Sequence, residues 1–307
     1  MSNYTIQNDD IAPEQEVERL DDLHVSITGY LDGRLSFAPL ESLSPSLILE
    51  LGSGSGAWYV RMTFLAIDDN NLSRAIQAAK QFPNARVTAA DMTELPARVL
   101  PPNMAFKKVD LTQTLPFDRE SFDIIHARLT MMHVREFLPA QTLEPEVLTM
   151  YKLPQAMDIL RRVTQCLKSG GWLIVEEPDD DCFWNNGGPP GRNIEKLLGA
   201  WHRSMRERGA EPCIGRLLED DLRALGMFTE IHSHYVDIPL SNQSSVTSEN
   251  QLGAGWQRTM RRVIPMLKQS LSSYGITDAI LEAAQSELDD PEKSLTTRMY
   301  FTWSKKS

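Results

Sequence analysis

ILELGSGSGAW, residues 48–58, decides the fold class, because an apolar run ends beside an acid and then passes into alternating glycines. An apolar run that stops at glycine is typical of a buried strand followed by a tight turn. Glycines leave the backbone bare where a ligand must approach closely. In open parallel sheets, ligands bind beyond the carboxyl ends of the strands. The stretch therefore predicts a ligand-binding turn after the first strand of an α/β sheet.

Two cofactor classes fit these glycines. Gly52, Gly54 and Ala57 satisfy the dinucleotide fingerprint G-x-G-x-x-G/A, which keeps a nicotinamide-dependent oxidoreductase open. The alternative is an E-x-G-x-G-x-G turn, in which Glu50 precedes the glycines and Gly56 is the last of them. An acid at this place suits a cofactor with a cationic ammonium group, such as S-adenosylmethionine. It disfavours a pyrophosphate, because like charges repel.

Further apolar runs alternate with helix-like stretches, which predicts β-α units and a parallel sheet. These runs are RVTAAD (86–91), MAFKKVD (104–110), FDIIHA (122–127) and GWLIVEE (171–177). The segment LPQAMDILRRVTQCLKSGG (153–171) predicts a helix that stops at Gly170.

The pattern loosens after residue 178. A loop is predicted over 184–193, a helix over 194–208, and strands over 228–240 and 296–304. Between these two strands, apolar residues recur at helical spacing from Trp256 to Leu271. This amphipathic helix is interpreted either as core packing or as part of a lid.

Acids follow three successive predicted strands, namely Glu50, Asp91 and Asp110. Three acids in register favour one ligand site over separate helix caps. Asp91 suits the ribose hydroxyls, and Asp110 suits the adenine amine. Asp91 lies farther from the glycines than the usual roughly 20 residues. Asp68 or Asp69, after MTFLAI, therefore remains the alternative ribose ligand.

These stretches resemble class I S-adenosylmethionine-dependent methyltransferases, and more narrowly the fungal LaeA/UMTA-like group of secondary metabolism. The resemblance rests on residues 48–58, on the region 89–129 with its PPN and FDIIHARL stretches, and on LKSGGWLIVEE (167–177). The leader ERLDDLHVSITGYLDGRLSFAPL (18–40) also resembles that group. The resemblance implies a Rossmann-like, mostly parallel seven-stranded sheet with helices on both faces. A helical leader and a helical insertion are expected to form a cap.

The resemblance also implies S-adenosyl-L-methionine as cofactor, lying across the ends of the first four strands. The residues expected to line its methionine part are Glu50, Gly52, Ser53, Gly54 and Gly56. Those expected at the ribose are Asp91 and Met92, those at the adenine are Asp110 and Leu111, and those closing the pocket are Ala127, Arg128 and Leu129. The expected function is O- or N-methylation of a small-molecule acceptor in secondary metabolism. A non-catalytic, methyltransferase-like regulator is the alternative.

Methyl transfer from a sulfonium needs alignment and exclusion of water, and a hydroxyl acceptor also gains from a base. The candidate bases are His133 after the fourth strand, Glu177 at the end of the fifth and His24 in the leader. His126 is interpreted as a packed or hydrogen-bonded strand residue. The acidic run 179–181 is interpreted as a solvated loop, and no metal site is predicted.

Composition narrows the partners and the location. The 307 residues carry a net charge of −11, which argues against nucleic acid and anionic lipid as partners. The three cysteines are scattered, and no apolar run is long enough to span a membrane. We therefore expect a cytoplasmic enzyme with a small-molecule substrate; no pattern specifies its oligomeric state. The expected division is a leader or cap segment (1–40), a core (41–240), a helical insertion or lid (241–295) and a closing strand (296–307).

Overall fold

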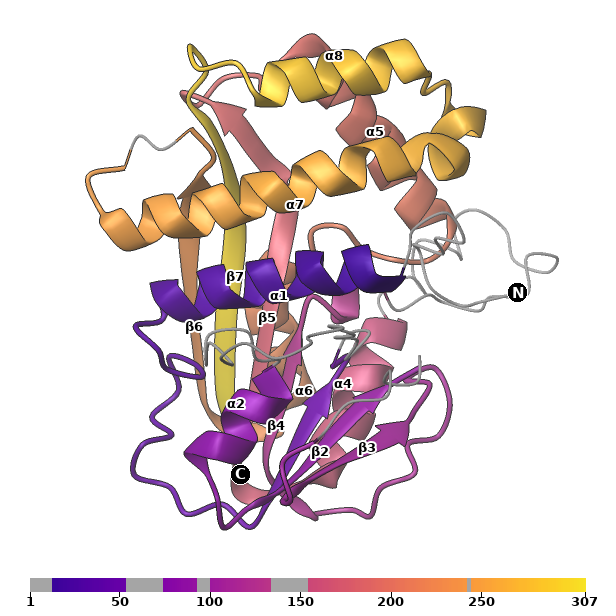
Figure 1. The fold of residues 1–307 in the computed structure, drawn as a ribbon. Coiled ribbons are helices and arrows are strands. Elements are labelled where there is room, and N and C mark those ends of the chain that lie inside the picture. Colours follow the sequence, from indigo (N-terminus) through magenta and orange to yellow (C-terminus); the bar gives the residue numbers. More distant parts are fainter. Residues whose placement is uncertain (1–12, 54–73, 93–99, 134–153, 242–243) are drawn as a thin grey trace, which may run out of the picture.

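The computed structural model describes residues 13–53, 74–92, 100–133, 154–241 and 244–307, with the backbone alone at 13–18, 133 and 154–156. Within these ranges, seven strands form one sheet in the order β3-β2-β1-β4-β5-β7-β6 (Figure 1). The strands are β1 (Leu47–Leu51), β2 (Arg86–Asp91), β3 (Met104–Lys108), β4 (Phe122–Arg128), β5 (Leu167–Asn185), β6 (Phe228–Pro239) and β7 (Leu295–Lys306). Strands β1 to β5 run parallel, and β7 is antiparallel to both of its neighbours. The expected mostly parallel, seven-stranded α/β sheet is confirmed.

The order of the strands reverses between β1 and β4, which lie side by side at the centre of the sheet. Such a switch point opens a crevice beyond the carboxyl ends of the strands, because the connections leave toward opposite faces there. The glycine turn follows β1 directly at Gly52. The fold therefore places the predicted ligand turn at the switch point.

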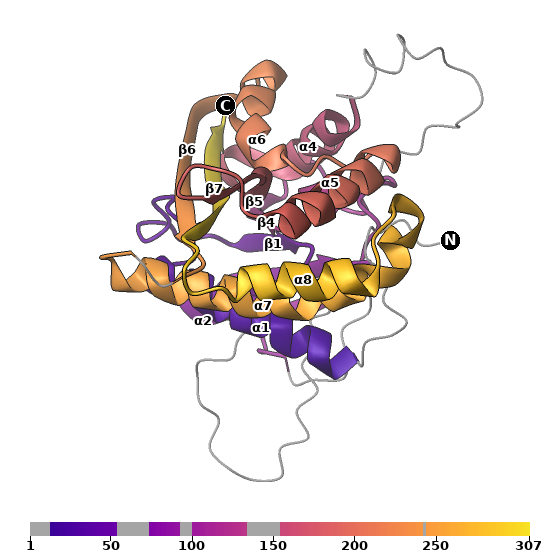
Figure 2. The ribbon, with the colours of Figure 1, turned by 90° about the horizontal axis from the view of Figure 1, so that it is seen from above.

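Seven α-helices lie in the described ranges. They are α1 (Pro13–Tyr30), α2 (Arg74–Gln81), α4 (Pro154–Cys166), α5 (Arg192–Glu207), α6 (Ile214–Leu225), α7 (Thr247–Leu271) and α8 (Asp278–Leu288). Seen from above, α2 lies on one side of the sheet and α4 and α6 lie on the other (Figure 2).

Alternation along the strands sends neighbouring side chains to opposite faces of the sheet. Ile48 packs in the cluster that contains the buried alanines of α2. Leu49 packs in the larger cluster, which contains Leu160 of α4 and Leu218 of α6. A polar side chain near a strand end is therefore committed to one face by its position in this alternation.

The structure corrects two predictions around β5. The helix that begins at Pro154 ends at Cys166 rather than at Gly170, because Leu167 already pairs with Phe122 of β4. The strand then continues to Asn185, well beyond the predicted end, because it pairs with β7 along most of its length.

The acidic run 179–181 is therefore part of this strand, and its interpretation as a solvated loop is wrong. Asp179 is fully buried, and Asp180 accepts a hydrogen bond from Trp201 Nε1 at 3.1 Å. Asp181 is more exposed and pairs with Arg216.

Helix α1 crosses the carboxyl ends of the central strands and lies side by side with α7 (Figure 1). The two helices approach so closely that a Cβ atom at Gly255 would lie 1.9 Å from Ser26 Oγ. An ion pair at 3.0 Å joins Arg258 Nε of α7 to Asp22 Oδ2 of α1. Helix α7 thus fixes α1 from the side that faces away from the strands.

Replacing Gly255 with alanine should test this contact. We expect the free energy of unfolding to fall by about 1–3 kcal/mol, because the methyl group overpacks a filled interface. Gly199 of α5 is a matched control, since the nearest atom to a Cβ there is Arg203 Nη1 at 3.7 Å. Gly199→Ala should be neutral or stabilising by up to about 1 kcal/mol, through helix propensity. Urea unfolding measures both, and equal midpoints would contradict the close packing.

Candidate active site

Charged side chains from three strand ends meet at the switch point. Glu50 of β1, His126 of β4 and Glu176 of β5 share the face of Ile48, because each stands an even number of positions from a residue of that cluster. The parallel register sets Glu50 opposite His126 and Arg128 opposite Glu176. The juxtaposition is therefore a property of the sheet and does not depend on the loops.

Two arginines balance the two carboxylates. Glu176 Oε2 accepts from Arg128 Nε at 2.5 Å and from Arg74 Nη1 at 3.1 Å. Arg74 Nε also lies 3.7 Å from Glu50 Oε2. Glu50 Oε1 lies 2.8 Å from His126 Nδ1, and both of these side chains are buried. We call these five residues the charged cluster.

The electrostatics of the charged cluster follow from its burial. Burial alone would raise the pKa of Glu176, but the guanidinium groups of Arg128 and Arg74 hold it well below its usual range. Burial lowers the pKa of Arg74 to about 10, so it stays cationic at neutral pH. Within the charged cluster, the two guanidinium groups therefore balance the two carboxylates.

A pocket of about 140 Å³ lies beside the charged cluster. The strand ends contribute Glu50, Gly52, Ser53, Arg128 and Leu129, α2 contributes Arg74 and Ala75, and α1 contributes Leu20, Asp21, Leu23, His24 and Ile27. A larger hollow of about 590 Å³ lies at the opposite edge, near Ser46 and Asn103. We assign the site to the smaller pocket, because ligands of such sheets bind at the carboxyl edge.

The turn after β1 has the features of a ligand cradle. Gly52 has a φ of +61°, and a Cβ atom there would lie 2.0 Å from Thr130 Oγ1, so only glycine fits. Ser53 donates its backbone N–H to Ala90 O, whereas its hydroxyl is buried without a hydrogen-bond partner among the described residues. An orphaned hydroxyl and a buried carboxylate on one pocket fit a ligand that carries both hydrogen-bonding and cationic groups.

The other predicted cofactor residues lie along the same edge. Asp91 is the last residue of β2 and is 9% exposed. Met92 follows it. Asp110 Oδ1 accepts from the N–H and the hydroxyl of Thr112, so this acid also stabilises its own turn. Leu111 is buried.

The remaining cofactor residues divide between the described and the undescribed parts of the chain. Ala127 and Leu129 flank Arg128 at the end of β4. Gly54 and Gly56 lie outside the described residues, as do Asp68 and Asp69 of the alternative ribose assignment. These cofactor roles remain predictions.

The three predicted bases lie in different settings. His133 ends a 3₁₀ turn (Met131–His133), and its side chain lies outside what the structure describes. His24 Nδ1 accepts from Arg128 Nη1 at 3.3 Å, and its Nε2 lies 3.4 Å from Thr28 Oγ1. Burial, together with Arg128, lowers the pKa of His24 well below its usual value.

Glu177 faces away from the charged cluster, on the side of the larger core. Its Oε1 accepts the backbone N–H groups of Thr130 and Met131, each at 2.7 Å. Burial raises the pKa of Glu177 to about 8, although these amides oppose the shift. The carboxyl group therefore holds the loop that follows β4, and Glu176 is the glutamate on the cluster side.

Sequence reasoning missed Arg74 and the ion pairs of Glu176. The position of Glu176 could have been found from the alternation along β4 and β5, which sets it on the same face as His126 and Arg128. No local pattern marked Arg74, whose partners lie far from it in the sequence. The interpretation of His126 as a packed, hydrogen-bonded residue is confirmed.

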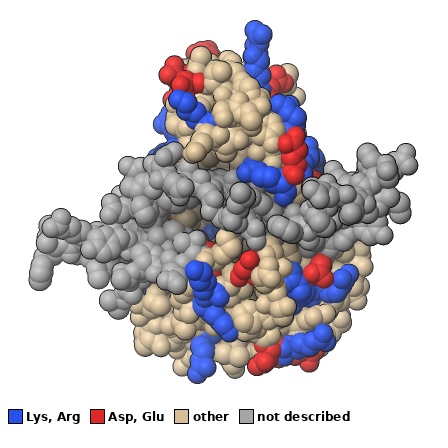
Figure 3. Space-filling view, turned by 90° about the vertical axis from the view of Figure 1, so that its right-hand side faces the viewer, with Lys and Arg blue, Asp and Glu red and all other residues tan. Residues whose placement is uncertain are grey.

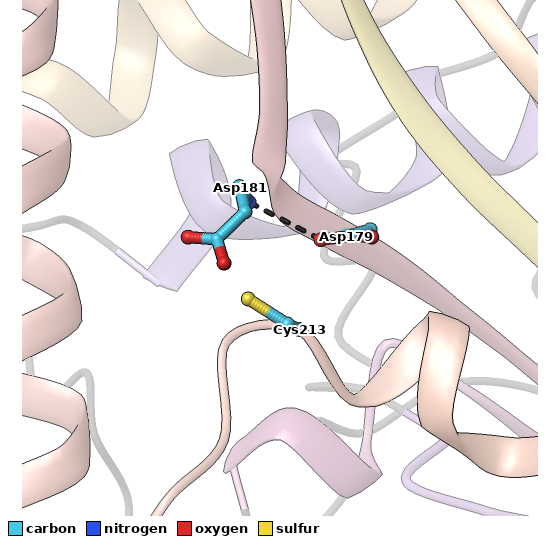
Figure 4. Close-up of side chains that lie close together, drawn as sticks. All are labelled: Asp179, Asp181 and Cys213. Carbon is cyan, nitrogen blue, oxygen red and sulfur yellow. Dashed lines mark hydrogen bonds between the residues drawn. The ribbon is translucent and has the colours of Figure 1, made fainter.

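A second polar cluster joins β5 to the loop before α6. Atoms of Asp179, Asp181 and Cys213 lie within 4.8 Å of one another (Figure 4). Arg216 approaches both carboxylates, at 3.5 Å and 2.5 Å, and His202 Nδ1 lies 3.1 Å from Asp181. A guanidinium thus supplies the cation that these acids require, so we interpret the cluster as an ion-pair connection.

Comparisons with known proteins bear on the family and the fold of this chain. Residues 26–226 match the profile of a methyltransferase domain. Methyltransferase str2 of Strobilurus tenacellus is 32% identical over 304 residues, covering 97% of this chain and 95% of the relative. Secondary metabolism regulator LAE1 of Hypocrea atroviridis is 25% identical over 195 residues, covering 62% of this chain and 46% of the relative. A solved structure of loganic acid methyltransferase with SAH shares the fold, with a TM-score of 0.53, 14% identity and coverage of 98% and 99% of the two chains.

The raised pKa of Glu177 gives a pH test of its role. The folded chain binds this proton more tightly than the unfolded chain, because the folded pKa of about 8 lies above the ordinary 4.5. The resulting stability is complete below about pH 4.5 and is lost as the pH rises through about 8, by at most about 1.4 kcal/mol per pH unit.

Glu177→Gln keeps the acceptor oxygen and removes the titration. We therefore expect the difference in unfolding free energy, variant minus wild type, to grow between about pH 5 and pH 8. Urea unfolding at several pH values measures it, and a difference that does not vary with pH would contradict the assignment.

Proposed function

The chain belongs to the methyltransferase domain family, and from that premise we propose that it transfers the methyl group of S-adenosyl-L-methionine to an oxygen or nitrogen atom of a small molecule in fungal secondary metabolism. The observation that carries the proposal is the pocket at the switch point, which joins an acid, a glycine-only turn and an orphaned hydroxyl under a helical roof. The name of one relative, Secondary metabolism regulator LAE1, supports the metabolic setting. The family assignment favours methyl transfer over a nicotinamide-dependent reaction and over a purely regulatory role.

We assign the cofactor residues by their positions along the carboxyl edge. Glu50, Gly52 and Ser53, together with Gly54 and Gly56 that follow them in the sequence, are assigned to the methionine part. The ribose site is assigned to Asp91 with Met92, the adenine site to Asp110 with Leu111, and the closing wall to Ala127, Arg128 and Leu129. The end of β2 at Asp91 supports the ribose assignment, because β2 lies beside β1. When bound, the cofactor supplies an activated methyl group on a sulfonium.

The protein's own contribution is to align the acceptor with the cofactor and to exclude water from the pocket. Leu20, Leu23 and Ile27 of α1 form an apolar roof on the pocket. Such a roof excludes water from the reacting groups and limits the poses of an acceptor.

The leader and the insertion therefore have different roles in this proposal. Helix α1 roofs the pocket, and α7 supports α1 from behind. Trp256, the first residue of the predicted amphipathic helix, is buried in the large core, and no residue of α7 is among the described lining residues.

The surface and the cysteines fit a small-molecule enzyme of the cytoplasm. On the face shown in Figure 3, the positive and negative side chains of the described residues are interspersed, and these residues form no continuous track for a phosphate backbone. No described helix has the length and apolar character needed to cross a bilayer. The three cysteines are free thiols, as is usual in a reducing compartment.

Transfer of label tests the proposed function. The purified chain is incubated with methyl-labelled S-adenosylmethionine and a fungal extract of small metabolites, and the labelled product is identified by mass spectrometry. Asp91→Ala is the control, and loss of its hydrogen bonds to the ribose should weaken donor binding by about 10- to 100-fold. Donor binding without any labelled product would favour the regulator. Heat on titration with NAD(P), and none with the donor, would favour the oxidoreductase.

Among the predicted bases whose side chains the structure describes, His24 is the one that lines the pocket, and its replacement tells the acceptor classes apart. If His24 takes the proton of a hydroxyl acceptor, His24→Gln should lower kcat by about 100-fold or more, with donor affinity unchanged. An amine that arrives deprotonated needs no base, so kcat for it should change little. Because the pKa of His24 is lowered, the wild-type rate should stay level as the pH falls through 6.5. An equal kcat in the wild type and in His24→Gln with a hydroxyl acceptor would contradict the base role, and a loss of activity near pH 6.5 that is absent from His24→Gln would contradict the lowered pKa.

A further inference from the structure

We propose that His126 is a positioning residue that acts through Glu50 on the amino-acid end of the bound cofactor. The inference rests on the proposed function, because it takes Glu50 as the residue that meets the cofactor's ammonium group. His126 itself does not line the pocket.

The sheet fixes the contact between the two side chains. Glu50 and His126 are register partners on adjacent parallel strands, and their side chains are 5% and 2% exposed. The distance from His126 Nδ1 to Glu50 Oε1 is 2.8 Å. A carboxylate oxygen can only accept, so Nδ1 carries the hydrogen and the ring orientation is defined.

This hydrogen bond uses one of the two oxygens of Glu50. The other, Oε2, lies 3.7 Å from Arg74 Nε, which is beyond hydrogen-bond distance. Glu50 also lines the pocket. His126 therefore fixes the carboxylate by one oxygen and leaves the second without a full hydrogen bond from a described residue.

The second ring nitrogen of His126 has no comparable partner among the described residues. His126 Nε2 lies 3.5 Å from Glu176 Oε2 and makes no hydrogen bond with a described residue. Glu176 is already balanced by Arg74 and Arg128, and Glu50 has its hydrogen bond from Nδ1. The contact with Glu50 is therefore the one hydrogen bond that the His126 ring makes with a described residue. His24 of α1 meets this cluster through the hydrogen bond from Arg128.

Packing alone does not require a histidine at this position. Ile124 and Ile174 occupy the same face and contribute to the core beside α2. An aliphatic residue at position 126 would continue that core. It would leave the buried Glu50 carboxylate without its donor, which points to the hydrogen bond as the reason for the histidine.

The experiment compares two ligands by calorimetric titration. S-adenosylhomocysteine carries the amino-acid end, and 5′-methylthioadenosine has the same nucleoside and a sulfur atom but lacks that end. His126→Phe removes the donor. His126→Asn places an amide N–H near the position of Nδ1, whereas His126→Gln places one near Nε2 and serves as the matched control.

We expect His126→Phe and His126→Gln to weaken S-adenosylhomocysteine by about 10- to 100-fold, the effect of losing one charge-assisted hydrogen bond. Binding of 5′-methylthioadenosine should change by less than about twofold, and His126→Asn should restore most of the affinity. In a Glu50→Gln background, the change at position 126 should have no further effect on S-adenosylhomocysteine. If the Phe variant does not fold, the Asn and Gln pair decides the question.

Equal weakening of both ligands would overturn the inference, because a merely structural histidine disturbs the whole pocket. Additive effects of the changes at 126 and 50 would overturn it too, and both outcomes leave the proposed function standing. A wild-type chain that binds neither ligand would overturn the proposed function, and the inference with it.

Discussion

The fold depends on the balance of charge at the ends of the three central strands. Glu50 and Glu176 are buried there, and a buried carboxylate is tolerated only when it is paired. Arg128 supplies one partner from β4 and Arg74 supplies the other from the start of α2. Loss of either arginine would leave a buried negative charge, so the position of α2 on the sheet is tied to the site. Helix α1 is connected to these charges by the hydrogen bond from Arg128 to His24.

Strand alternation gives two adjacent glutamates different tasks. Glu176 points to the face of α2 and enters the charged cluster, where the arginines keep it ionised. Glu177 points to the opposite face, where no cation is paired with it among the described residues, and burial raises its pKa. Its oxygen binds the backbone amides that follow β4, the same loop that crowds Gly52 through Thr130. One glutamate thus shapes the electrostatics of the pocket, and the other sets the position of the loop beside it.

Local features of the sequence were enough to predict the parts of the fold with local causes. LILEL and RVTAAD coincide with β1 and β2. A short apolar run that ends at glycine or beside an acid predicts a buried strand from local sequence alone. The extension of β5 through the acidic run could not be found in this way, since it depends on pairing with β7 more than one hundred residues later. The role of Arg74 could not be predicted from local sequence either, because its partner Glu176 is 102 residues away. The glycine turn predicted the place of the site, and the pairing of strands determined which charges meet there.

The roof of the pocket follows from a different constraint, the close contact of two helices. Gly255 lets α7 come within side-chain contact of Ser26, and Arg258 adds an ion pair to Asp22 at the surface. Helix α1 is thereby fixed by α7 on one side and by the charged cluster on the other, with its apolar residues on the pocket. A change in the charged cluster would therefore alter the roof as well as the cofactor site, because His24 connects the two.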